Sequence, residues 1–229
     1  MLKLELDHFF ILVEPGAKVA NLLVELGLEE SFSRDHPGQG TSNLCFSFSN
    51  SKLELLWLRD EDEANNGPAK GLKFPDRYSN REASPFGLIF NGKASIDNTS
   101  DLAMPFDGWR YQPEYFPAPR AFHVGINSDN LIEPLCIYMP FMEPVKREVD
   151  LTREKGQFSA ISNVHIHVPV ELLSQELAIA SQAEGLTVER GAEHLMEVTF
   201  TRASNDTSKS NTCVSSKDLR PDLPLILHW

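Results

Sequence analysis

The pattern of hydrophobic and polar positions over the first 59 residues predicts one strand, one helix and three further strands. The chain alternates from its start and becomes continuously apolar from Phe9 to Val13, as in a buried strand. Apolar residues then recur at helical spacing, and Gly27 is placed to end that helix. The expected elements are a strand over 2–13, a helix over 17–26, and strands over 28–34, 43–48 and 52–58.

The same β-α-β-β-β order returns twice in weaker form. A charged linker over 60–68, expected to be a solvated loop, separates the first run from the second. The second run has strands over 86–91, 109–112, 121–127 and 135–139, with a poor helix or polar excursion over 94–102. The third has a strand over 164–168, a helix over 171–184, strands over 187–190, 195–202 and 224–229, and a polar excursion over 203–212.

These runs predict an α+β protein with three modules, over residues 1–59, 84–142 and 161–229. The expected architecture is a set of repeated βαβββ modules whose helices lie on the outside of a curved sheet. The loops are too irregular for a doubly wound parallel sheet.

Composition narrows the classes of partner. With 33 acidic and 21 basic residues, the net charge is −12, which argues against binding nucleic acid or an anionic membrane through a broad charged surface. No apolar run approaches the roughly 20 residues that span a bilayer, and the start lacks a secretory pattern. The three cysteines are widely spaced, so reduced thiols in a cytoplasmic protein are expected.

The candidate chemistry begins with a lone carboxylate, Glu54, inside an apolar strand. A buried carboxylate is costly unless it is paired, hydrogen-bonded or bound to a metal, and His8 in the first strand is the nearest suitable partner. Strand alternation puts Lys52, Glu54 and Leu56 on one face. The pair is a candidate ligand or metal site, with Glu54 also a candidate proton-transfer base; the alternative is a quiet hydrogen-bonded pair.

A second candidate is the pair His165 and His167, which lie two residues apart on one strand and therefore share a face. Such a pair can chelate one metal ion, or it can be a hydrogen-bonded polar face. The remaining histidines, at positions 36, 123, 194 and 228, are expected at the surface or in structural roles. An anionic or planar ligand could meet a pocket lined by Arg81, Trp109, Tyr111 and Tyr115.

Several stretches resemble the glyoxalase-like proteins of the vicinal oxygen chelate superfamily. The resemblance is carried by Leu6 to Val13, by the helix that ends at Gly27, by the HPGQGTSN segment from His36, and by Leu53 to Trp57. It implies paired βαβββ modules in an open, incompletely closed barrel, with His8 and Glu54 pointing into a cup that holds a divalent metal. Lyase, isomerase or dioxygenase chemistry on vicinal oxygens would follow. An imidazole and a carboxylate suit Zn, Fe, Mn or Ni.

The partner of the first module stays open at this point. In the second run, the position that matches His8 falls near Phe86, and the position that matches Glu54 falls within 136–138. In the third run, they fall within 163–165 and at Leu225 or Ile226. Neither match supplies the second carboxylate that the superfamily normally uses. Two functions therefore remain: a metal-dependent enzyme, or a metal-free protein that binds a small ligand. The third run could instead be a lid over the cup or the surface of a homodimer.

Overall fold

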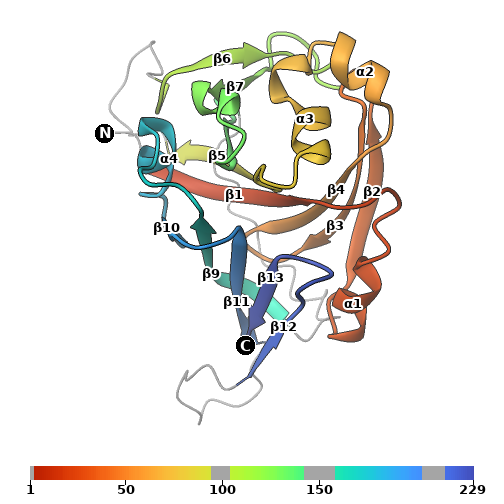
Figure 1. Ribbon diagram of the computed structural model, residues 1–229, viewed down its shortest axis with the longest axis vertical. Coiled ribbons are helices and arrows are strands. Elements are labelled where there is room, and N and C mark those ends of the chain that lie inside the picture. The colour runs from red at the N-terminus through yellow and green to blue at the C-terminus, as the bar shows by residue number, and fades with distance from the viewer. Residues whose placement is uncertain (1–2, 94–103, 142–157, 203–214) are drawn as a thin grey trace.

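The structure, a computed structural model, describes residues 3–93, 104–141, 158–202 and 215–229 as two mixed sheets with few helices (Figure 1). The first sheet contains β1 (Lys3–Leu12), β2 (Glu30–His36), β3 (Thr41–Ser47), β4 (Lys52–Leu58), β5 (Phe86–Lys93), β6 (Gly108–Tyr111), β7 (Phe122–Gly125) and β8 (Leu135–Tyr138). The second contains β9 (Phe158–Val168), β10 (Leu186–Arg190), β11 (Leu195–Arg202), β12 (Ser216–Asp218) and β13 (Leu225–His228). The helices are α1 (Ala20–Glu25), α2 (Glu61–Asn66), α3 (Phe74–Ser79) and α4 (Gln175–Ala180), with 3-10 turns η1 (Lys70–Leu72) and η2 (Ile126–Asp129).

The first sheet joins the first two runs of the sequence. Its strand order is β2-β3-β4-β1-β5-β8-β7-β6, and the two halves meet where β1 pairs antiparallel with β5. Within each half the first strand pairs parallel with the last, β1 with β4 and β5 with β8. Over the described residues the sheet does not close into a barrel. The α+β class expected from the sequence is confirmed.

The third run forms a sheet of its own, in the order β10-β9-β11-β13-β12. Here β9 lies between β10 and β11, whereas β1 in the first run pairs with the last strand of its run. The third run therefore shares an element order with the first run but not its strand order.

A continuous core joins the two sheets. Strand alternation sends Phe9 and Ile11 to the back face of the first sheet, where they pack with apolar side chains of the second sheet such as Val164 and Val198. The side chain of Asn50, in the β3–β4 turn, also bonds both backbone groups of Ile161 in β9. The second sheet packs on the face of the first sheet opposite to Glu54, so the alternative that it forms a lid over the cup was wrong.

The opposite face of the first sheet, here called the inner face, is partly filled by residues 61–79. Figure 1 shows the first sheet curving around α2 and α3. Phe74 packs on Phe10 with a ring-centroid distance of 6.0 Å, and Leu72 belongs to the same apolar cluster. The expectation that all helices lie outside the sheet was therefore wrong for this segment.

The expectation of a solvated loop over 60–68 was also wrong. Asp60 caps α2 by accepting a hydrogen bond from the backbone N–H of Glu63, and Glu61, Asp62 and Glu63 occupy the positive end of the helix. The charge run that suggested a loop thus stabilises the start of a helix.

Two expected segments, 94–102 and 203–212, lie outside the described residues. Among the helices of the described residues, none has the length and apolar character needed to span a membrane.

Candidate functional site

The inner face carries a buried charge cluster of Glu54, Lys52 and His8. Glu54 is 5% exposed, and its Oε1 lies 2.5 Å from Lys52 Nζ and 3.6 Å from His8 Nε2. The parallel pairing of β1 with β4 and the shared face of positions 52 and 54 bring the three side chains together. The structure therefore joins His8 and Glu54, as the sequence predicted, and adds Lys52.

The cluster determines the charge of Glu54. Burial opposes ionisation of this carboxyl, but the positive charges of His8 and Lys52 and the hydrogen bond from Lys52 outweigh it and lower the pKa to about 2. A carboxylate with so low a pKa is a weak base near neutral pH. Glu54 is thus better suited to hold charge than to remove a proton.

The imidazole of His8 is oriented by a hydrogen bond to the neighbouring residue, Asp7. Asp7 Oδ2 lies 2.6 Å from His8 Nδ1, and Asp7 Oδ1 accepts a hydrogen bond of 3.1 Å from Asn91 Nδ2. A carboxylate on Nδ1 fixes the tautomer with the proton on that nitrogen, so Nε2 faces Glu54. This arrangement suits a histidine that binds a ligand or exchanges a proton at Nε2.

A second polar group lies at the edge strands of the inner face, around His36. Its Nδ1 lies 3.0 Å from the hydroxyl of Thr41, and its Nε2 accepts a hydrogen bond of 3.3 Å from Arg34 Nε. Burial is the main cause that lowers the pKa of His36, to about 4, so the ring is neutral near pH 7. His36 was expected to be a surface or structural histidine; it is buried beside the candidate site.

The turn between β2 and β3 contacts β6 and the residues that follow it, at the opposite end of the first sheet. Gln39 Oε1 accepts hydrogen bonds from the hydroxyls of Tyr111, at 3.0 Å, and Tyr115, at 3.1 Å. Gly40 has a φ of +72°, and a Cβ there would lie 2.3 Å from the carbonyl oxygen of Asp60. A side chain at this position would separate the turn from α2, which explains the glycine.

The donor set at His8 and Glu54 does not fit a catalytic metal site, which uses three protein ligands and one open position. On the other half of the sheet, the neighbouring positions on β5 and β8 are Ile89, Leu135 and Ile137. Lys52 already takes one oxygen of Glu54. Among the described residues, no group of three or more His, Cys, Asp or Glu ligand atoms includes this pair.

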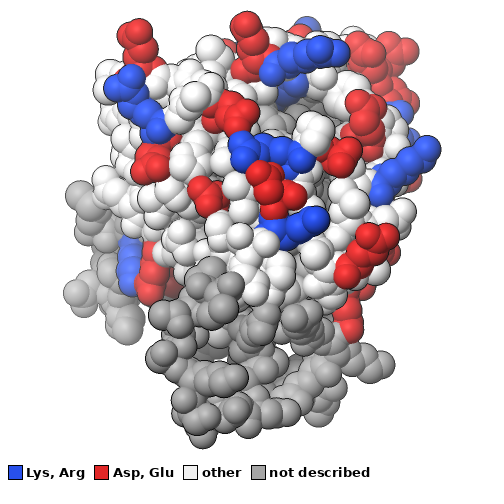
Figure 2. All heavy atoms as spheres, turned by 60° about the horizontal axis from the view of Figure 1, so that its bottom comes forward, with Lys and Arg blue, Asp and Glu red and all other residues white. Residues whose placement is uncertain are grey.

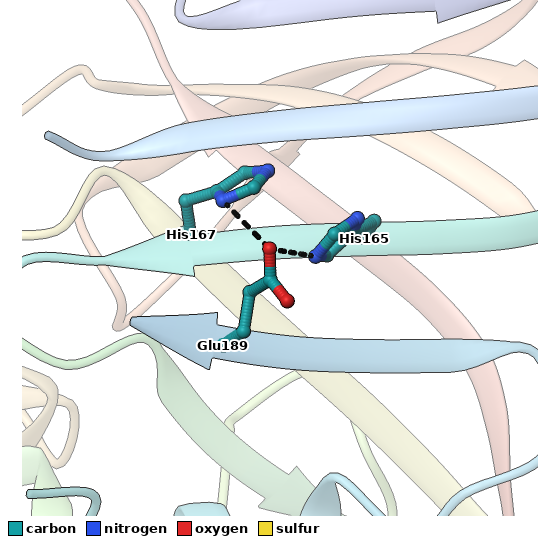
Figure 3. Close-up of side chains that lie close together, drawn as sticks. All are labelled: His165, His167 and Glu189. Atoms are coloured by element: carbon teal, nitrogen blue, oxygen red, sulfur yellow. Dashed lines mark ion pairs between the residues drawn. The ribbon is translucent and has the colours of Figure 1, made fainter. Parts of the chain in front are cut away.

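A different cluster lies on the outer face of the second sheet, formed by His165 and His167 of β9 and Glu189 of β10 (Figure 3). Glu189 Oε1 lies 3.0 Å from His165 Nε2 and 3.4 Å from His167 Nδ1. His167 Nε2 bonds Glu197 Oε1 at 2.8 Å, and His228 Nε2 bonds Glu197 Oε2 at 2.7 Å. We call these five residues the outer cluster. The sequence predicted that His165 and His167 share a face and missed the other three.

A pocket of about 770 Å³ lies apart from both clusters, between the end of β1, α3 and the loops of the second sheet. Its lining includes Arg77, Arg81, Glu193, His194 and Asp222. Arg77 Nη1 donates to the backbone carbonyls of Glu133 and Leu131 at 2.8 and 3.1 Å, so this guanidinium is committed to the fold.

The residues expected to line one aromatic pocket are therefore divided. Arg81 belongs to the 770 Å³ pocket, whereas Tyr111 and Tyr115 bind Gln39 beside the inner face. Trp109 donates from Nε1 to the hydroxyl of Ser128 at 3.1 Å.

The two described cysteines behave as apolar core residues. Cys45 and Cys136 are buried and unbridged, and burial raises the pKa of both thiols, to about 12 for Cys45. On the face shown in Figure 2, acidic and basic side chains are interspersed over the described residues.

With this geometry in place, the chain can be compared with known proteins. No protein-family model matches it, and no curated protein does. A crystal structure of a hypothetical protein from Staphylococcus aureus is similar over 98% of both chains, with a TM-score of 0.56 and 11% identity. A hypothetical protein from Bacillus halodurans is similar over 61% of this chain and 96% of its own, with a TM-score of 0.40 and 18% identity. The Staphylococcus likeness shows a shared fold, and no activity comes with it.

Proposed function

We propose that this chain is a glyoxalase-like, small-molecule-binding protein whose ligand site is the inner face around His8, Glu54 and Lys52. In this proposal residues 1–59 and 84–142 are two βαβββ modules of the vicinal oxygen chelate type. The support is the strand order, in which β2-β3-β4-β1 on one side of the β1–β5 pair mirrors β6-β7-β8-β5 on the other.

The observation that carries the proposal is the ionised, buried carboxylate of Glu54 between Lys52 and His8. Replacing a buried ion pair with apolar side chains of similar volume is often neutral or stabilising. Stability alone therefore gives no reason to keep these three ionisable groups together in a buried position. A polar ligand does give one.

The charges define the class of ligand. Lys52 offers an ammonium donor to oxygen atoms, and His8 offers Nε2 to a hydroxyl group. Arg34 contributes a second permanent cation, with its guanidinium 5.6 Å from the ring centroid of Tyr115. Glu54 supplies a matching acceptor for a hydroxyl group. We therefore assign a small organic molecule with adjacent oxygen atoms, at least one of them anionic.

We place the ligand at this cluster rather than in the 770 Å³ pocket. The most buried charged group of that pocket, Arg77, already binds backbone carbonyls, and Glu193 is paired with Arg220 on the surface. A cavity of this size is typical of small-molecule sites, so it is the natural alternative and is included in the test.

The experiment is calorimetric titration of the full chain with glycolate, lactate and oxalate, each of which carries adjacent oxygens with at least one of them anionic. Binding should weaken at least tenfold in His8→Ala, Glu54→Gln and Lys52→Met, and should not change in Arg81→Ala. Weakening in Arg81→Ala alone would move the site to the pocket. Equal binding by all four variants, with each shown to be folded, would refute the proposal.

The second candidate function is a metal-dependent lyase, isomerase or dioxygenase, favoured by the 3.6 Å approach of His8 Nε2 to Glu54. Because the donor set has two members, this candidate requires an ion completed by the substrate or by water. It predicts a divalent metal that is lost in both His8→Ala and Glu54→Ala. Metal analysis of the purified variants separates the two functions.

A further inference from the structure

The outer cluster has the geometry of three ligands around one ion. His165 Nε2, His167 Nδ1 and a carboxylate oxygen of Glu189 all lie within 4.8 Å of one another. Two ligand atoms on a tetrahedral zinc ion, each about 2.0–2.1 Å from the metal, are separated by roughly 3.3 Å. The distances of 3.0 and 3.4 Å from Glu189 Oε1 to the two nitrogens match that separation.

One nitrogen of the cluster lacks a hydrogen bond. His165 Nε2 is buried and has no hydrogen-bond partner among the described residues, although Glu189 Oε1 is 3.0 Å away. A buried polar atom without a partner costs free energy, and its lone pair is available to a ligand from outside. Figure 3 shows this nitrogen and His167 Nδ1 both turned toward the Glu189 carboxylate.

A supporting carboxylate stands behind the second histidine. Glu197 Oε1 accepts the bond from His167 Nε2, which places the proton on Nε2 and leaves the lone pair of Nδ1 facing His165 and Glu189. Metal-binding histidines commonly donate their other ring N–H to a carboxylate in this way. His228 donates to the other oxygen of Glu197 and holds it in place.

The charge balance also favours a cation. The described ion pairs of Glu189 and Glu197 are all with histidines, and none of these pairs contains a lysine or an arginine. The two carboxylates therefore lack, among their described ion pairs, the permanent cation that Lys52 supplies to Glu54 on the inner face.

We propose that His165, His167 and Glu189 bind a divalent transition-metal ion of the Zn²⁺ class on the outer face of the second sheet, with Glu197 and His228 positioning His167. Two imidazoles and one carboxylate suit zinc and leave a fourth coordination position open to water or to a small ligand. This site is separate from the proposed ligand site and does not depend on it.

The test uses the full chain, freed of metal with a chelator and without a histidine tag, titrated calorimetrically with Zn²⁺. One ion per chain should bind. Affinity should fall at least tenfold in His165→Ala, His167→Ala and Glu189→Gln, and by about tenfold in Glu197→Gln, the usual loss when an outer carboxylate is removed. Thr187→Ala is the matched control, because Thr187 lies on the same face of β10 two residues before Glu189.

A second measurement distinguishes the loss of a metal ligand from misfolding of a variant. Co²⁺ bound by nitrogen and oxygen ligands in four-coordinate geometry absorbs visible light, and this absorption should disappear in Glu189→Gln, whose exposed side chain can be changed without affecting the core. The proposal is overturned if the folded wild-type chain binds neither ion. It is also overturned if binding survives in Glu189→Gln and His165→Ala, or is lost in Glu54→Gln instead.

Discussion

Two histidine–carboxylate clusters of this protein differ in how their negative charge is balanced. On the inner face, Glu54 is buried and already neutralised by Lys52 at 2.5 Å, with His8 nearby. On the outer face of the second sheet, Glu189 is 53% exposed at its side chain and meets only histidines among the described ion pairs. The first cluster contains a lysine that pairs with its carboxylate, whereas the described ion pairs of Glu189 contain only histidines. Residue types alone would not have separated them.

The largest expected effect is the loss of the internal cation on the inner face. Lys52→Met leaves the buried carboxylate of Glu54 without its nearest cation, which should reduce the free energy of unfolding by about 4 kcal/mol. Urea denaturation measures this value. The matching change in the outer cluster is Glu189→Gln in the metal-free protein. This variant should change the free energy of unfolding by less than about 0.5 kcal/mol, because the side chain is exposed.

The ion pair of Lys73 and Asp129 is the exposed control, tested with Lys73→Met. If Lys73→Met lowered the unfolding free energy as much as Lys52→Met, the proposed importance of burial would be contradicted. That pair is exposed at 33% and 78% of its side chains, so its removal should cost less than about 1 kcal/mol. Equal losses at positions 52 and 73 would mean that burial adds nothing to the inner-face pair.

Acid should weaken the inner-face cluster next. The folded-state pKa of Glu54, about 2, lies below its ordinary value of 4.5, so between these pH values the unfolded chain binds more protons. Stability from Glu54 is therefore fully present above about pH 4.5 and is lost as the pH falls through 2. The loss amounts to about 3 kcal/mol, measured as the difference in unfolding free energy between wild type and Glu54→Gln across this range. Identical pH profiles for the two proteins would contradict the assignment.

The smallest effect belongs to the outer cluster and comes from added metal. Zinc at about one hundred times its dissociation constant should raise the unfolding free energy by about 2.7 kcal/mol. The same gain is expected in Glu54→Gln, and none in His165→Ala. Thermal unfolding with and without zinc measures all three. A gain that depended on Glu54 would place the ion on the inner face.

Much of the fold could be predicted from local patterns. The strands of the first run and the hairpin at Asn50 and Ser51 follow from alternation and turn residues, because one face of each strand is buried. Residues 61–79 were missed because charged side chains dominate the start of α2, although Asp60 and Glu63 have capping spacing. The pairing of β1 with β5 is long-range and leaves no local signal.

The residues of the two sites also differ in whether a local pattern predicts them. Alternation alone puts Lys52 with Glu54, and His165 with His167, on shared faces. Glu189 meets His167 only because β9 and β10 pair in parallel with one particular register. Glu197 joins them through the antiparallel pairing of β9 with β11. Strand order and register bring these residues together, and neither is visible in a single sequence.

The core shared by the two sheets has a consequence for chains that are truncated before the second sheet. Phe9 and Ile11 of β1 are fully buried against the second sheet and its helices. A premature stop codon ahead of β9 would leave this apolar surface open to water, and surfaces of that kind invite aggregation. Such a chain would be removed by quality control even though every residue of the inner face is still encoded. Mutations that truncate the gene late should therefore behave as complete losses of function.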